Sequence, residues 1–212
     1  MALEIKQMLV GSMAVFCYIV YDTEEKVCAL IDPAFNTRKI LKTVQEMGLK
    51  VIYVINTHAH PDHTSGNREI IEATGAKLLI HKDEAKRLGG LVSKTMSKMM
   101  GGKSSPIADI LLKDGSEITI GKGKLEVIHT PGHTSGGICL YYPGNVITGD
   151  SLFVGGIGRT DLPGGSTEVL LKSIKKRLLT LPGDTIVWPG HHYGAKPHST
   201  IKWEKTSNAF LF

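Results

Sequence analysis

The densest group of potential metal ligands is the segment Thr-His-Ala-His-Pro-Asp-His, which begins at Thr57. It supplies three imidazoles and one carboxylate from His58, His60, Asp62 and His63. Neutral imidazole is a favoured ligand of zinc, iron and copper, and a carboxylate partly neutralises the charge of a divalent ion. The segment follows an apolar run that is typical of a buried strand. A loop leaving that strand can direct all four side chains into one cleft.

Three further segments each offer one potential ligand shortly after an apolar run. These ligands are His133, Asp150 and His191, and each is directly preceded by a glycine. Glycine allows the backbone to approach a crowded site closely. Any one segment would be a weak signal, but the four together disfavour the alternative of a histidine-rich surface loop. The sequence therefore predicts a metal site with seven candidate ligands.

The elements that must position these side chains follow from hydrophobic periodicity. The predicted strands are residues 14–21, 27–32, 51–55, 77–81, 117–120, 125–129, 136–142, 145–148 and 185–188. The predicted helices are residues 37–47, 66–74, 83–88 and 169–180. Strands and helices in this order indicate a layered α/β architecture with the candidate ligands at strand ends.

Two features of the sequence each allow two interpretations. Asp32 follows a predicted strand and precedes a proline, so it either orients a metal ligand through a hydrogen bond or ends the strand in a simple turn. Residues 89–106 are rich in glycine, serine, lysine and methionine. They form either a mobile lid or insertion that faces the substrate, or a surface helix with a loop.

Composition indicates one domain with a substantial core, because 42% of the 212 residues are hydrophobic. The cysteines, Cys17, Cys28 and Cys139, are odd in number and scattered, which fits a reducing compartment better than a disulfide framework. No apolar run reaches the length of a membrane span, about 20 residues. The N-terminus lacks the basic start and apolar stretch of a signal peptide. We therefore expect a cytoplasmic protein with no membrane partner.

The formal net charge of +5 would suit either nucleic acid or an anionic small molecule. The basic residues are spread along predicted helix faces, as at Lys172, Lys175 and Lys176, which is typical of a solvated surface. Nothing resembles an RNA-binding signature with interleaved aromatic residues. We expect an anionic small-molecule substrate and no nucleic-acid partner, and the oligomeric state stays open.

The ligand series His-x-His-x-Asp-His, followed by a histidine, an aspartate and a histidine, resembles that of the metallo-β-lactamase superfamily from about residue 14 to residue 191. The resemblance implies an αββα four-layer sandwich of the α/β class, formed by a single domain over residues 1–212. It also implies that His58, His60 and His133 hold one metal ion, that Asp62, His63 and His191 hold a second, and that Asp150 bridges both.

Such a centre would hold a hydroxide between two divalent ions, whose charge lowers the pKa of water toward neutrality. Zinc is the expected metal, with iron or a zinc and iron pair as alternatives. Asp62 would orient the nucleophilic water or accept its proton, which makes it the expected catalytic residue.

Within the superfamily, the chain most resembles the glyoxalase II (hydroxyacylglutathione hydrolase) group and its persulfide dioxygenase relatives. The resemblance rests on the motifs TPGHTSGGI at residues 130–138, GDSLF at 149–153, GIGRTD at 156–161 and PGHHY at 189–193. Both groups act on glutathione conjugates, which are anionic. We therefore expect Arg159 and Tyr193, from the last two motifs, to bind the substrate.

The resemblance implies two reactions that use different metals. Glyoxalase II-like enzymes hydrolyse acyl-glutathione thioesters, whereas persulfide dioxygenases oxidise glutathione persulfide with one iron and molecular oxygen. In the second case His58, His133 and Asp150 alone would hold iron. We favour a thioester hydrolase because the seven ligands most simply describe a two-metal site.

Departures and remoter alternatives also follow from the sequence. Only residues 194–212 follow the last ligand, where full-length glyoxalase II carries a helical domain that binds glutathione. Arg159 also stands where those enzymes usually carry a lysine-containing segment. A non-catalytic metal-binding protein would be expected to lose a ligand, a nuclease would need a further nucleic-acid-binding domain, and a lactamase would be expected to carry an export signal.

Overall fold

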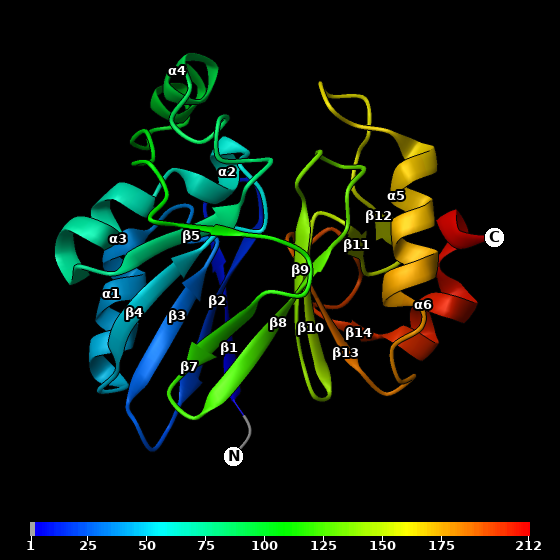
Figure 1. The fold of residues 1–212 in the computed structure, drawn as a ribbon, viewed down its shortest axis with the longest axis horizontal. Coiled ribbons are helices and arrows are strands. Elements are labelled where there is room, and N and C mark those ends of the chain that lie inside the picture. Colours follow the sequence, from blue (N-terminus) through cyan, green and yellow to red (C-terminus); the bar gives the residue numbers. More distant parts are fainter. Residues whose placement is uncertain (1–2) are drawn as a thin grey trace.

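The computed structural model describes residues 3–212, apart from the side chains of residues 91–93. Two six-stranded sheets face each other, and helices cover the outer face of each sheet (Figure 1). The first sheet contains, in spatial order, β1 (Glu4–Val10), β2 (Val15–Asp22), β3 (Val27–Ile31), β4 (Lys50–Ile55), β5 (Lys77–His81) and β6 (Ile110–Leu112). Its outer face carries α1 (Thr37–Glu46) and α3 (Asn67–Thr74).

The second sheet is built from the C-terminal half of the chain. It contains, in spatial order, β14 (Ser199–Thr200), β13 (Ile186–Pro189), β10 (Asn145–Gly149), β9 (Ile138–Tyr142), β8 (Gly123–His129) and β7 (Glu117–Ile120). Its outer face carries α5 (Thr167–Ser173), the π-helical turn η1 (Ile174–Leu178) and α6 (Ile201–Ser207). The short strands β11 (Leu152–Phe153) and β12 (Gly156–Ile157) pair with each other, and the 3₁₀ turn η2 (Ala209–Leu211) follows α6.

Alternation along the strands explains the four layers, because successive side chains of a strand point to opposite faces. In β2, Cys17 and Ile19 pack toward the helices of the first sheet, whereas Tyr18 and Val20 pack between the sheets. A third apolar layer lies between the second sheet and its helices. Three apolar layers therefore separate four structural layers, and the expected αββα arrangement is confirmed.

Parallel strands place the candidate ligands at one edge. β3 runs parallel to β4, and β10 runs parallel to β13, so the carboxyl ends of each pair meet at the same end of the sheet. The loops that leave β4, β10 and β13 carry candidate ligands, as does the loop after β8, which pairs antiparallel with β9. The site lies at the rim where both sheets end.

The structure corrects several boundaries. The predicted helix over residues 83–88 is wrong, because these residues form successive turns in which Glu84 O accepts hydrogen bonds from the amides of Arg87 and Leu88, at 2.9 and 3.2 Å. β1 was not predicted. The predicted helix over residues 169–180 begins at Thr167 and continues as a π-helical turn, η1. The remaining predicted strands and helices are present within a few residues of their predicted ends.

Residues 89–106 contain α4 (Leu91–Met99), which contacts α2 (Pro61–Thr64). The chain after α4 is tied to the start of α3, since Lys103 N donates to Ser65 O at 3.1 Å and Asn67 Nδ2 donates to Ser105 Oγ at 2.9 Å. None of the helices within residues 3–212 is both long and apolar enough to cross a membrane.

Candidate metal centre

All seven candidate ligands lie together at the rim of the two sheets. His58, His60 and His133, which we call the first triad, have ligand atoms within 4.8 Å of one another. His60 Nδ1 lies 3.0 Å from both His58 Nε2 and His133 Nε2. Two nitrogens that each bind one zinc ion at 2.0–2.1 Å in tetrahedral geometry are roughly 3.3 Å apart. The spacing of the first triad therefore suits a single ion.

The second triad consists of Asp62, His63 and His191. The Nε2 atoms of His63 and His191 are 3.1 Å apart, and Asp62 Oδ2 lies 3.7 Å from the first and 3.4 Å from the second. These distances again suit three ligands around one ion. Each triad takes two ligands from the loop after β4 and one from the second sheet.

Asp150 lies between the triads. Its Oδ1 is 3.4 Å from His63 Nε2, and its Oδ2 is 3.5 Å from His133 Nε2 and 3.4 Å from His191 Nε2. Oδ1 is buried and has no hydrogen-bond partner among the described residues. A buried carboxylate oxygen without a partner is costly unless a cation satisfies it. The donor set and this oxygen both fit a pair of divalent ions.

Local structure explains why four ligands fit into six residues. His60 is extended and precedes α2, and Pro61 occupies the first turn of this helix. The ring of a proline at this position fixes a backbone angle that suits the start of a helix. The loop therefore turns into a helix between His60 and Asp62, and this turn separates the ligands of the first triad from those of the second.

The glycines before the ligands of the second sheet are required by close packing. Gly149 has a positive φ of 48°, and a Cβ there would lie 2.6 Å from Thr57 Oγ1. A Cβ at Gly190 would collide with Asp150 Oδ1. The ligand loops of the two sheets are thus in direct contact, as the glycine-rich sequence indicated.

Hydrogen bonds from the outer side of the rings orient three histidines. Nδ1 of His63 lies 2.9 Å from Asp32 Oδ2, Nδ1 of His191 lies 2.9 Å from Met13 O, and Nδ1 of His133 lies 2.7 Å from Arg159 O. An acceptor at Nδ1 holds the proton there and leaves Nε2 free to bind a metal. Of the two interpretations of Asp32, the structure supports the one in which it orients a candidate ligand, His63.

The two triads differ in their electrostatics. Burial lowers the pKa of His58 well below its usual value and, together with the charge of His133, lowers that of His60 to about 4. In the second triad, burial would also lower the pKa values of the histidines. The carboxylates of Asp150 and Asp62 outweigh this effect and raise the pKa of His63 to about 9 and that of His191 to about 10. Because the facing Nε2 atoms are 3.1 Å apart, the pair holds one shared proton more readily than two.

The predicted substrate-binding residues lie beside the centre but differ in their contacts. Tyr193 stacks on His191, with ring centroids 4.5 Å apart, and 60% of it is exposed. The exposed guanidinium of Arg159 forms a bidentate ion pair with Asp161, at 2.8 and 2.7 Å. The backbone carbonyl of Arg159, rather than its side chain, contacts a candidate ligand.

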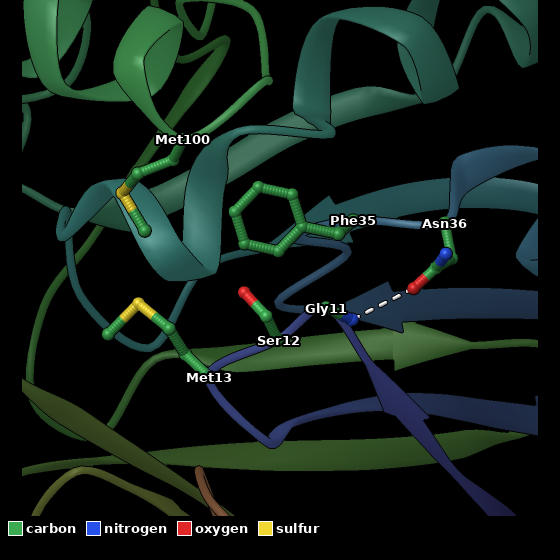
Figure 2. Close-up of a pocket in the computed structure, with 6 residues that line it drawn as sticks. All are labelled: Gly11, Ser12, Met13, Phe35, Asn36 and Met100. Atoms are coloured by element: carbon green, nitrogen blue, oxygen red, sulfur yellow. Dashed lines mark hydrogen bonds between the residues drawn. The ribbon is translucent and has the colours of Figure 1, made fainter.

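A cavity lies between the β1–β2 turn and the end of α4 (Figure 2). Its volume is about 280 Å³. It is lined by Gly11, Ser12, Met13, Phe35, Asn36 and Met100. Asn36 Oδ1 accepts a hydrogen bond from Gly11 N at 2.8 Å, which fixes one wall (Figure 2). Met13 belongs to both the cavity and the centre, because its carbonyl contacts His191.

Sequence reasoning missed the contributions of Met13 and of the Arg159 carbonyl, because every residue carries a backbone carbonyl and no residue type marks one. It also missed Glu84, a buried carboxylate that contacts two ligand loops. His81 and His129 stack on each other, with ring centroids 4.3 Å apart, and take no part in the two triads.

Comparisons with known proteins agree with this geometry. The family model described as "Metallo-beta-lactamase superfamily" matches residues 10–191. "Probable metallo-hydrolase YqgX" of Bacillus subtilis (strain 168) is 36% identical over 210 residues, which cover 97% of this chain and 96% of the relative. "Persulfide dioxygenase ETHE1, mitochondrial" of Homo sapiens is 34% identical, covering 98% and 75%. "Hydroxyacylglutathione hydrolase GloC" of Haemophilus influenzae is 32% identical, covering 92% and 92%.

Two solved structures are similar over nearly their whole length. The BLEG-1 B3 metallo-beta-lactamase has a TM-score of 0.89 and 32% identity, covering 98% of this chain and 99% of that one. The di-iron-bound form of TTHA1623 has a TM-score of 0.85 and 32% identity, covering 97% and 100%. The chain belongs to the metallo-beta-lactamase superfamily, and its homologues there include both a hydroxyacylglutathione hydrolase and a persulfide dioxygenase.

Proposed function

We propose that this protein is a metal-dependent hydrolase that cleaves a thioester such as an acyl-glutathione. The observation that carries the proposal is the completeness of the second triad. Asp62, His63 and His191 are in place, and two of them have their own orienting partners, Asp32 and Met13 O. A second ligand set with its own orienting partners is most simply explained by a second ion. The relative described as a probable metallo-hydrolase supports the same conclusion.

The proposed ligands divide between two divalent ions, with zinc as the expected metal and iron or a mixed pair as alternatives. His58, His60 and His133 would hold one, Asp62, His63 and His191 the other, and Asp150 would bridge them. When bound, such ions supply a water of lowered pKa and a Lewis acid for the substrate carbonyl.

Asp62 is the residue we propose to handle the proton of the attacking water. Its side chain is 14% exposed, whereas that of Asp150 is 9% exposed and those of His63 and His191 are nearly inaccessible. In the metal-free protein, burial would raise the pKa of Asp62, but the charge of His63 and a hydrogen bond from His191 hold it below its usual value. An ionised carboxylate that water can reach is able to accept a proton.

Arg159 and Tyr193 are proposed to bind the anionic part of the substrate. Tyr193 exposes its ring next to His191 and beside Phe153, whose ring centroid is 5.5 Å away. Arg159 would have to exchange Asp161 for a substrate carboxylate, which an exposed pair allows at little cost.

We further propose that residues 89–106 act as a lid on the α2 side of the centre. α4 lies against α2, the helix that carries Asp62 and His63, and Met100 at its end lines the cavity of Figure 2. Shortening the segment between Gly90 and Gly102 should raise KM for an acyl-glutathione while metal content stays constant. Unchanged KM would reject the lid.

A second candidate function is persulfide dioxygenation, favoured by the human relative that carries this name at 34% identity over 98% of this chain. In that case His58, His133 and Asp150 would hold a single iron, a donor set known from non-haem iron oxygenases.

One experiment separates the two. The protein is expressed in unsupplemented medium, purified without oxygen or chelator, and its metals are measured by mass spectrometry. About two ions per chain, together with release of free thiol from S-acetylglutathione, would support the hydrolase. One iron per chain, with oxygen consumption on glutathione persulfide, would replace it by the dioxygenase. Hydrolysis of nitrocefin by the same protein preparation tests for lactamase activity, because one similar structure is described as a B3 metallo-beta-lactamase.

A further inference from the structure

Glu84 is a buried carboxylate that is not among the candidate ligands. It is 0% exposed, and both of its oxygens accept backbone hydrogen bonds. Oε2 accepts from Ala59 N at 3.0 Å, and Oε1 accepts from Gly136 N at 2.9 Å. Two backbone amides from different segments therefore converge on one carboxyl group, and Glu84 links the two segments directly.

Both of these segments carry ligands of the first triad. Ala59 lies between His58 and His60, in the loop that leaves the first sheet. Gly136 lies three residues after His133, in the loop between β8 and β9 of the second sheet. A single side chain therefore fixes the separation of two loops that come from different sheets.

The surroundings of Glu84 are built for this contact. A Cβ at Gly136 would lie 2.8 Å from Glu84 Cγ and 3.0 Å from His81 Nδ1, so a glycine lets the loop approach. The chain around Glu84 turns back on itself, since Glu84 N donates to His81 O at 2.9 Å. This turn, which stands where a helix was predicted over residues 83–88, directs the carboxylate of Glu84 toward the two ligand loops.

The second triad has separate supports. His63 is oriented by Asp32 and His191 by the carbonyl of Met13, and neither contact involves Glu84. We propose that Glu84 is a positioning residue for the first triad, which holds the His58–His60 loop and the His133 loop at the separation that one metal ion needs. The inference rests on the proposed metal centre, but not on the reaction that the centre performs.

The test compares metal binding in the wild-type protein and in the variants Glu84→Gln, Glu84→Asp and Glu204→Gln. Glu84→Gln keeps the size of the side chain but replaces one acceptor oxygen by an NH₂ group, which faces a backbone N–H and cannot accept from it. Glu204→Gln is the matched control, because Glu204 is also 0% exposed and accepts from Gly155 N at 3.2 Å and Asn208 Nδ2 at 2.8 Å, and neither donor lies in the two loops that Glu84 joins. Glu84→Asp provides a second variant if Glu84→Gln does not fold.

The metal-free proteins are titrated with cobalt(II), and each binding step is followed by its visible absorption. His60→Ala and His191→Ala assign the steps to the first and second triads. We expect Glu84→Gln to weaken the first-triad step by about 10- to 100-fold, as losses of outer hydrogen bonds to ligands do, and to leave the second step within about threefold. Glu84→Asp should fall between wild type and Glu84→Gln, and Glu204→Gln should bind as wild type does.

Melting temperatures of the metal-free variants separate positioning from plain stabilisation. Glu84→Gln and Glu204→Gln should each lose stability, because both lose buried hydrogen bonds, yet only the first should lose affinity at the first triad. Equal affinities in Glu84→Gln and wild type, or equal losses at both triads, would overturn the inference and leave the metal centre intact. A wild-type protein that binds no cobalt would overturn the metal centre itself.

Discussion

The two triads of the centre take their residues from the same parts of the fold, but the pKa values of their histidines are shifted in opposite directions. Each combines two ligands from the loop after β4 with one ligand from the second sheet. In the first triad, burial lowers the pKa values of His58 and His60 and so favours the neutral imidazole, which is the state that binds metal. The second triad contains Asp62 and, next to Asp150, holds a proton on its histidine pair. The same scaffold thus holds one pair of histidines, His58 and His60, whose pKa values are lowered and another pair, His63 and His191, whose pKa values are raised.

The comparison breaks most completely at Asp150, which contacts both triads. Asp150→Ala should remove metal from both and lower activity by more than about 100-fold, the upper end of the loss from a missing outer partner. Mass spectrometry measures the metal content, and the release of free thiol from S-acetylglutathione measures the activity. Asp184→Ala, at an exposed aspartate, is the control. Full metal content in Asp150→Ala would reject the bridging role.

Asp32→Asn should weaken the second triad by about 10- to 100-fold and leave the first nearly unchanged, because only His63 loses a charged acceptor at Nδ1. Asparagine is the suitable replacement, since Asp32 has a positive φ of 49° that asparagine tolerates. Competition with a chelator measures the two affinities. An equal loss at both triads would mean that Asp32 acts by holding Thr57, whose amide and hydroxyl also donate to it at 2.9 and 2.6 Å.

Acidification should sharpen the difference between the triads. The pKa values of the second-triad histidines are raised, to about 9 and about 10, so below these values a proton must leave before metal binds. The affinity of this triad should fall by up to about tenfold for each unit that the pH decreases from 8 to 6, for one shared proton. We expect a smaller change for the first triad, because the pKa of His60 is lowered to about 4. Zinc titrations between pH 8 and 6 measure the affinity of each triad, and His191→Ala assigns the second-triad step. If the affinities of both triads fell equally with pH, the prediction would be wrong.

The smallest effect is expected outside both triads. Arg159→Ala should raise KM for an anionic thioester by about two- to tenfold and leave metal content unchanged, because the carbonyl that orients His133 remains. Arg177→Ala is a close control, since Arg177 forms a similar exposed bidentate pair with Asp114, at 3.0 and 2.9 Å. If both variants raise KM equally, the effect is one of general charge.

The clustering of the candidate ligands could be predicted from sequence because it depends on side-chain type and short spacing. His58 to His63 lie within one loop, and the remaining ligands each follow a glycine that a crowded backbone requires. Runs of apolar residues in strands that are buried on both faces predicted a layered α/β architecture, and the family resemblance implied its αββα form. β1 escaped because it is an edge strand whose residues are mostly exposed or half-buried.

Other features depend on tertiary contacts that no local pattern reports. The carbonyls of Met13 and Arg159 orient ligands through groups that every residue possesses. Residues 83–88 have a helical pattern, but turns form there and the buried Glu84 carboxylate accepts two backbone amides. Local preference yields to tertiary hydrogen bonds at such a position.

The contribution of both sheets to each triad has a consequence for unfolding. Apart from the apolar layer, the sheets are joined near the rim by contacts such as Phe16 N to Gly190 O at 2.8 Å and Ile138 N to Thr57 O at 3.0 Å. Bound ions would act there as removable cross-links, so that separating the two sheets during unfolding would require breaking metal–ligand bonds. An ion present at 100 times its dissociation constant stabilises a folded protein by about 2.7 kcal/mol. The metal concentration would therefore determine the thermal stability of the protein and its resistance to proteolysis, in addition to its activity.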